Sequence, residues 1–277
     1  GDLDILTFGV LGTFMVMFSG DKSAVHVAKY QPMKLAAVEG LYDGGARAPF
    51  SMVPGVEVPG MLSILATHDI DGIVPGINDI LDGYTDNEGR TFPSVEERIA
   101  RGRIALDAFQ TYRQTKDTNV ALAAEARAVL DENMEHFGYG YLESAEEAVP
   151  PVMPVFWSFR LMIGFGSYCL LVLLVALYLA WKDKLAGKRW LYYAAFLAIP
   201  LIYIAGECGW MTAEGGRQPW TIEGLLPVRA AVSGISASNV ITTFWIFVAI
   251  FTFFLVVEMR ILLKAIKKGP EIDEKRV

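Results

Sequence analysis

The apolar residues of this chain are gathered in long blocks. Three blocks exceed the roughly 18 mainly apolar residues that are needed to cross ~30 Å of hydrocarbon. They are residues 155–181, interrupted by Arg160; residues 190–210, with Glu207 near the end; and residues 240–257, which carry no charge. Each block predicts a transmembrane helix.

A fourth block, residues 5–19, is shorter and has neither the basic start nor the small-residue cleavage site of a signal peptide. We interpret residues 1–19 as a partial or complete transmembrane helix. The sequence therefore predicts an all-α integral membrane protein with about four transmembrane helices. Its parts are this first helix, a large loop at 20–152, and three spans with a tail at 153–277.

Lysine and arginine in the short flanking segments predict the orientation. They are concentrated at residues 182–189 and after residue 260, so both segments should be cytoplasmic. The loop at 20–152 is then extracytoplasmic. It holds 21 acidic and 11 basic residues, and it has no basic stripe with interleaved aromatics that would suggest nucleic acid.

The loop itself should contain helices. The segment at 33–40 follows a proline and is filled with good helix formers, and Gly40 or the later Gly44-Gly45 can end this helix. Ser94 begins a capping box that opens a helix at 94–114. A second helix at 118–137 should form a helical hairpin with the first. Residues 43–92 are rich in glycine and proline, and no regular structure is predicted for them.

Cysteine and histidine exclude several chemistries. Cys169 and Cys208 lie inside apolar spans and form no Cys-x-x-Cys motif, so they are interpreted as structural thiols. His26, His68 and His136 all fall in the loop, with a spacing that fits no zinc pattern.

Two carboxylates lie at and just after the end of the second complete span. Glu207 ends its apolar run, and Glu214 comes seven residues later, which returns to the same face of a continuing helix. An ionisable group at the edge of hydrocarbon is costly unless it is paired, which favours a functional role. An interfacial glutamate that simply faces water is an equal alternative.

Further polar groups fall at the same depth as these carboxylates. Arg160 and Met162 lie one turn inside the first complete span, and Trp210 and Arg217 flank Glu214. Thioether, carboxylate and guanidinium together suit an iron porphyrin, since the first two can bind iron axially and the third can pair with propionates. Taken alone, a methionine in an apolar helix is far more often a packing residue.

Four short motifs carry a resemblance. They are Lys-Leu-Ala-Ala-x-Glu at 34–39, Phe-Arg-x-Met at 159–162, Glu-x-Gly-Trp at 207–210 and Gly-Arg-Gln-Pro-Trp at 216–220. In this order they resemble the C-terminal half of subunit I of cytochrome bd quinol oxidases, in the subgroup with a long quinol-binding loop. The resemblance covers nearly the whole chain.

The resemblance implies haem sites. Met162 matches the methionine ligand of the low-spin haem b iron, with Arg160 beside the propionates. Glu214 matches the glutamate ligand of the high-spin haem b iron, and Trp210 and Arg217 match residues packed around the high-spin haem pair, which includes haem d.

The resemblance also implies the reaction. Lys34 and Glu39 match the pair used in quinol oxidation at the outer membrane face. Electrons would pass through the haems b to haem d, where O2 becomes water. The two residues are five positions apart, or about 140° around a helix, so they should not face one quinol oxygen from the same side.

The resemblance also implies histidine haem ligands in further N-terminal spans of subunit I. No histidine of this sequence falls in a span. We therefore expect the N-terminal half of subunit I as a separate chain or missing segment, together with oxidase subunit II, a possible small accessory subunit and membrane lipid. The expected location is the bacterial inner membrane. Two alternatives stay open: a haem-depleted paralogous subunit, and a transporter or receptor with an outer gating domain.

Overall fold

The computed structural model describes residues 23–185 and 187–269. Three of its helices are long and apolar enough to cross a membrane, which confirms the mostly helical membrane fold. They are α7 (Val152–Trp181), α8 (Arg189–Gly215) and α9 (Ala237–Lys268). The helix predicted at 5–19 lies outside the described residues.

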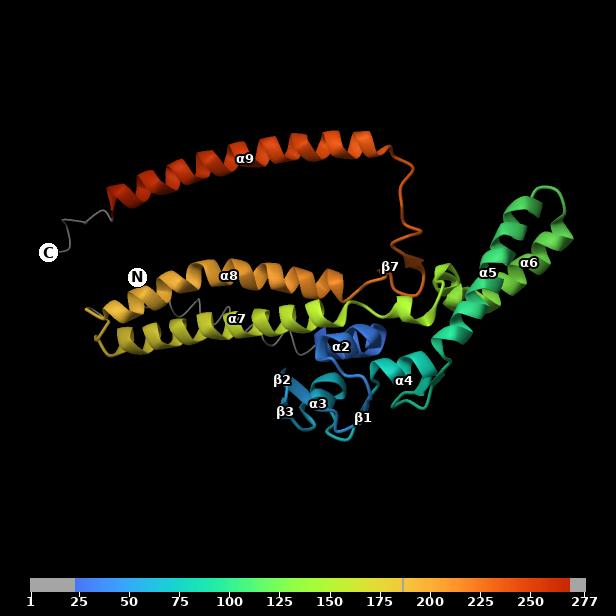
Figure 1. Cartoon of the computed structure of the whole chain (residues 1–277), viewed down its shortest axis with the longest axis horizontal. Coiled ribbons are helices and arrows are strands. Elements are labelled where there is room, and N and C mark those ends of the chain that lie inside the picture. Colours follow the sequence, from blue (N-terminus) through green and yellow to red (C-terminus); the bar gives the residue numbers. More distant parts are fainter. Residues whose placement is uncertain (1–22, 186, 270–277) are drawn as a thin grey trace. The chain divides into compact units, whose positions relative to one another are not determined.

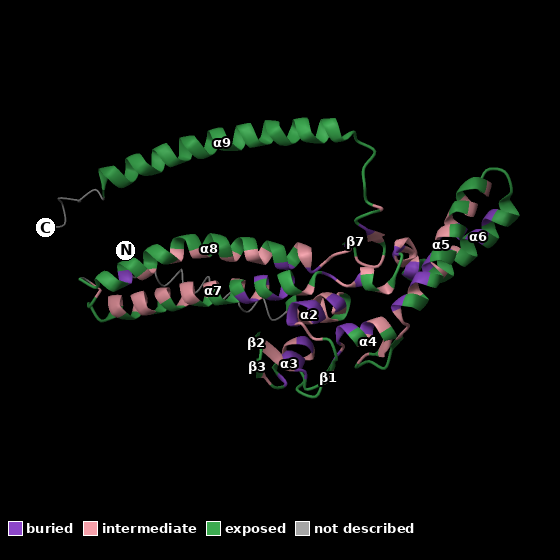
Figure 2. Ribbon diagram, viewed as in Figure 1, coloured by how far each residue is buried: buried purple, intermediate pink, exposed green. Residues whose placement is uncertain are grey.

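The chain forms two compact units, Gly1–Ala231 and Val232–Val277. The second unit contains α9, which begins where the hydroxyl of Ser236 accepts a hydrogen bond from the backbone N–H of Asn239. Apolar residues cover α9 all round, and none of its residues is buried within the chain (Figure 2). Such a surface is typical of a helix surrounded by lipid or by other spans.

In the first unit, α7 and α8 pack side by side as a helical hairpin (Figure 1). The hydroxyl groups of Ser158 and Thr212 lie 2.9 Å apart and share a buried hydrogen bond between the two helices. Further along, the hydroxyl of Tyr168 donates to the carbonyl of Ala194 at 3.0 Å. These contacts align the start of α7 with the end of α8. The predicted iron ligands lie at these two helix ends.

The loop has a small apolar core of its own. Residues 23–30 are helical and lead into α2 (Pro32–Glu39), which ends at Gly40 in the left-handed conformation, as the sequence predicts. Two short helices follow, α3 (Met61–Thr67) and α4 (Ile77–Asp82). One buried cluster of this core consists of Leu35, Ala48, Leu62, Ala66 and Val74.

Residues 43–92 are more regular than expected. Besides α3 and α4 they form three two-stranded antiparallel ribbons. The strand pairs are β1 (Gly45–Ala46) with β4 (Ile73–Val74), β2 (Phe50–Val53) with β3 (Val56–Val58), and β5 (Tyr84–Thr85) with β6 (Thr91–Phe92). The Pro54-Gly55 pair turns β2 into β3, with Gly55 at φ 84°, as a type II turn requires.

The helical hairpin of the loop is present as α5 (Val95–Thr115) and α6 (Val120–Asn133). The second helix ends before the predicted residue 137 and continues as a 3₁₀ segment, η1 (Met134–Tyr141). Here Gly140 lies against Gly102 of α5, so closely that a Cβ on Gly102 would come 2.3 Å from the Gly140 nitrogen. A second 3₁₀ segment, η2 (Ala145–Ala148), leads to α7.

A short hairpin follows α8. It consists of β7 (Trp220–Ile222) and β8 (Leu226–Pro227). The Trp220 side chain is only 4% exposed and belongs to a core cluster with Val95, Ile99, Leu142 and Ala148. This tryptophan therefore fixes the segment after α8 to the loop.

Candidate functional site

The loop and the first span are joined by a buried ion pair. The Arg160 guanidinium on α7 lies 2.8 Å from the Glu39 carboxylate at the end of α2, and their side chains are 7% and 2% exposed. Burial raises the pKa of Glu39, and the charge of Arg160 together with the N–H of Ser51 opposes this rise. The sequence predicts a role for each residue separately, and the structure brings them together.

The remaining donors of Arg160 are also used. Its Nη2 donates to the Ser51 carbonyl at 2.6 Å, and its Nη1 donates to the Val38 carbonyl. The Ser51 N–H in turn donates to the Glu39 carboxylate at 3.1 Å. The guanidinium carbon lies 3.7 Å from the ring centroid of Phe156, at stacking distance. This closed network satisfies both charges, as a buried pair requires.

The side chain of Lys34 on α2 contacts a different helix from Glu39. Its ammonium donates to the carbonyl of Ala213 on α8 at 3.0 Å. Burial and the nearby charge of Arg217 lower the pKa of Lys34, while Glu214 and Glu223 oppose that change. Lys34 therefore contacts α8 and Glu39 contacts α7, in agreement with the angle of about 140° between them on α2.

The thioether of Met162 lies between α7 and α8. A Cβ on Gly209 would come 3.1 Å from the Met162 sulfur, so this glycine leaves the space that the sulfur occupies. Met162 is half-buried, whereas the neighbouring Trp210 is 66% exposed and Glu207 is also exposed. The structure does not bring Glu207 into contact with the other predicted site residues that it describes.

Glu214 and Arg217 form an ion pair one turn apart at the end of α8. Their side chains are 44% and 35% exposed, so both can reach a group outside this chain. No cluster of three or more His, Cys, Asp or Glu residues that could hold a metal ion occurs in the part of the chain that the structure describes. Met162, which is half-buried, and Glu214, which is partly exposed, are both accessible to a group outside the described chain, and thioether and carboxylate are donors that an iron porphyrin can use.

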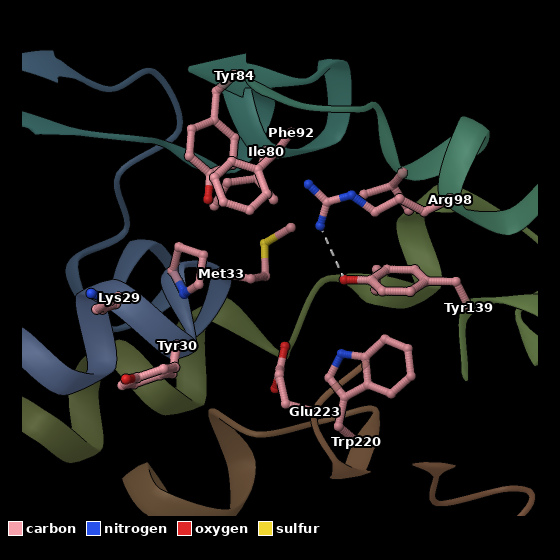
Figure 3. Close-up of a pocket in the computed structure, with 13 residues that line it drawn as sticks. Lys29, Tyr30, Met33, Ile80, Tyr84, Phe92, Arg98, Tyr139, Trp220 and Glu223 are labelled. Carbon is pink, nitrogen blue, oxygen red and sulfur yellow. Dashed lines mark hydrogen bonds between the residues drawn. The ribbon is translucent and has the colours of Figure 1, made fainter. Parts of the chain in front are cut away.

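The sequence did not point to two polar residues that line one cavity, Glu223 and Arg98. Glu223 lies in the turn between β7 and β8, and Arg98 lies in the first turns of α5. Both line a cavity that faces α2 (Figure 3). No sequence motif contains these two residues. An acid in a hairpin turn and an arginine on an amphipathic helix are normally solvated, so nothing in the sequence indicated that they would line a cavity.

Comparison with known proteins gives the family. The family described as cytochrome bd terminal oxidase subunit I matches residues 5–270. The chain is 34% identical over 292 residues to cytochrome bd-II ubiquinol oxidase subunit 1 of Escherichia coli (strain K12), covering 95% of this chain and 54% of that protein. It is 27% identical over 266 residues to cytochrome bd ubiquinol oxidase subunit 1 of Bacillus subtilis (strain 168), covering 96% and 48%.

The chain thus spans about half the length of these two relatives. The family match includes the loop, the three long helices and every predicted site residue. The chain belongs to the cytochrome bd terminal oxidase subunit I family.

Proposed function

We propose that this chain acts as the C-terminal part of subunit I of a bd-type terminal oxidase, which oxidises quinol at the outer membrane face and reduces O2 to water. One observation carries the proposal. Arg160, the partner of Glu39, lies two residues before Met162, and Ala213, the partner of Lys34, lies directly before Glu214. Both charged residues of α2 therefore contact the spans beside a predicted iron ligand.

The haem-binding part of the proposal uses the exposed sides of α7 and α8. Met162 would bind the low-spin haem b iron, and Glu214 would bind the high-spin haem b iron beside Trp210 and Arg217. The bound haems supply one-electron transfer. Arg160 would lie near the propionates without bonding to them, because its donors are used by Glu39 and by backbone carbonyls.

The loop would handle the quinol. Oxidation of a quinol releases two protons with its two electrons, so a carboxylate acceptor and a cation near the ring oxygens are useful. The pKa of Glu39 is raised, which suits a proton acceptor, and the pKa of Lys34, five positions earlier on α2, is lowered. Their contacts with α7 and α8 keep both groups near the membrane end of the loop.

The proposed assembly contains more than this chain. It includes the N-terminal half of subunit I, oxidase subunit II, haem d and membrane lipid, with a small accessory subunit as a further candidate partner. The proposed location is the bacterial inner membrane with the loop on the outer side. This placement follows from the lysine and arginine bias of the segments at 182–189 and after 260.

The test compares two electron donors on the purified complex. Glu39→Gln should slow quinol oxidation strongly and leave O2 reduction driven by an artificial one-electron donor unchanged. Glu57→Gln, at an exposed position in β3, is the matched control and should affect neither rate. Equal loss with both donors, in a variant whose haem spectrum is unchanged, would contradict a role of Glu39 in quinol oxidation.

A further inference from the structure

A cavity lies between α2, the start of α5, η1 and the hairpin after α8. Its volume is about 130 Å³. Figure 3 shows aromatic rings on several sides of it and polar groups on opposite walls. Its lining includes Lys29, Tyr30, Met33, Arg98, Tyr139 and Glu223.

Arg98 gives this cavity a polar wall. Its Nε donates to the Pro93 carbonyl at 2.9 Å and its Nη1 donates to the Tyr139 hydroxyl at 3.3 Å (Figure 3). Its Nη2 is buried and has no hydrogen-bond partner among the described residues. A buried guanidinium donor requires a partner, and water is the smallest group that can provide one. At ~30 Å³ for each molecule, the cavity has room for about four waters.

Glu223 faces the same cavity from the hairpin after α8 (Figure 3). Burial raises its pKa to about 7, against the opposing charges of Lys34 and Arg98. The residue before Lys34, Met33, also lines the cavity. The charges of two acidic groups thus act on Lys34, that of Glu223, which lines the cavity, and that of Glu214, the predicted iron ligand.

The cavity reaches the surface of the described chain at one end. Lys29 has a side chain that is 45% exposed, and Tyr30 is 64% exposed. Both lie in the helical segment before α2. The lining of one cavity thus includes the buried Arg98 donor and Glu223 together with the more exposed Lys29 and Tyr30.

We propose that Glu223 accepts a proton released when quinol is oxidised beside Lys34, and passes it through water in this cavity to the outside past Lys29 and Tyr30. This inference rests on the proposed function. In the step one O–H bond of the quinol breaks and an O–H bond forms on the Glu223 carboxylate, while the proton of the other O–H bond goes to Glu39, the acceptor of the proposed function. The two electrons of the quinol go singly to ferric haem in the complex. The carboxyl then gives its proton to water and becomes ionised again.

Among the described residues, the charges of Lys34 on α2 and Arg98 on α5 act on Glu223, and Glu223 in turn acts on the phenol of Tyr139 on η1. Arginine stays charged at every accessible pH, burial lowers the pKa of Lys34 from 10.5, and burial raises the pKa of Tyr139 from 10.0. Glu223 is the member of this group whose pKa is raised to about 7.

The experiment measures quinol oxidation by the whole complex from pH 5.5 to 8.5. The wild-type rate should fall below about pH 7, because a protonated Glu223 cannot accept a proton. Glu223→Gln should lower the rate at pH 8 by about a hundredfold, the lower end of what a positioned base contributes, and should remove this acid limb. Glu223→Asp should restore part of the rate and keep an acid limb.

Controls separate this role from folding and from the proposed function. Glu96→Gln, at an exposed position near the start of α5, should keep the wild-type profile. In a Glu223→Gln complex with an unchanged haem spectrum, a wild-type rate and acid limb would overturn the role of Glu223. A wild-type complex that reduces O2 with an artificial donor but oxidises no quinol at any pH would overturn the proposed function, and the inference with it.

Infrared spectroscopy offers a second readout that does not depend on turnover. Adding quinol to the wild-type complex at pH 8 should produce a transient carboxyl C=O band as Glu223 takes up a proton and passes it to water. The Glu223 part of the band should be missing from Glu223→Gln, and the full band should be present in Glu96→Gln. Persistence of the full band in Glu223→Gln would contradict the proposal.

Discussion

The guanidinium of Arg160 and the carboxylate of Glu39 lie 2.8 Å apart although 121 residues separate them in the sequence. One belongs to a membrane-spanning helix and the other to the end of α2 in the loop. Because both side chains are almost completely buried, neither charged group is solvated by bulk water. The pair therefore fixes the loop to α7 just before Met162.

Removing one member of this ion pair should lower the stability of the folded loop. Either Arg160→Met or Glu39→Met should destabilise the folded loop by about 3–5 kcal/mol, because each leaves one buried charge without its partner. The double variant should lose much less than the sum of the two. Thermal unfolding of the complex and limited proteolysis of the loop measure these effects.

An exposed pair provides the matched control. Arg101 and Glu97 on α5 are both 49% exposed, so Arg101→Met should cost less than about 1 kcal/mol. Strict additivity of the Arg160 and Glu39 single variants would show that the two side chains do not interact energetically.

The glycine beside Met162 predicts a second effect. Gly209→Ala should displace the Met162 sulfur, because the new Cβ would come 3.1 Å from it. Gly206→Ala is the matched control on the same helix, since nothing in the described chain lies within 4 Å of its Cβ position. Both changes favour the helix by a similar amount, about 1 kcal/mol.

The readout is the absorption spectrum and the midpoint potential of the low-spin haem in the reduced complex. We expect a shift in Gly209→Ala and the wild-type signal in Gly206→Ala. Identical signals in both variants would place the sulfur of Met162 away from the iron.

Burial of Glu223 predicts a dependence of stability on pH. The pKa is raised from 4.5 to about 7, so the folded chain binds this proton more tightly than the unfolded chain between those two values. The stability from this group is complete below about pH 4.5 and is lost as the pH rises to 7. The loss is about 2–3 kcal/mol, allowing for incomplete burial.

Glu223→Gln removes this titration. The thermal midpoint of the variant should rise relative to wild type by several degrees between pH 4.5 and 8. A midpoint difference that stays constant over this range would show that Glu223 titrates at its ordinary value.

The sequence predicts much of the fold, for identifiable reasons. The apolar runs at α7, α8 and α9 leave few structures other than spanning helices, and Gly40 ends α2 because a left-handed residue is needed there. The ribbons between residues 43 and 92 carry no such signal. Most of their strands are only two or three residues long, too short for an alternating pattern.

The candidate site was predictable only in part. Short motifs indicated Lys34, Glu39, Met162 and Glu214, but local sequence says nothing about pairing between Glu39 and Arg160. Such pairing depends on how the loop folds back onto α7. Glu223 was missed for the same reason, because its burial arises from packing against α2 and α5.

The central claim is that Met162 binds the iron of the low-spin haem. The most direct test is the redox difference spectrum of the purified complex carrying Met162→Leu, a substitution that keeps the volume and the apolar character of the side chain. We expect the low-spin haem b signal to disappear while the assembled complex and the remaining haem signals persist. An unchanged low-spin signal in the assembled variant would contradict the account.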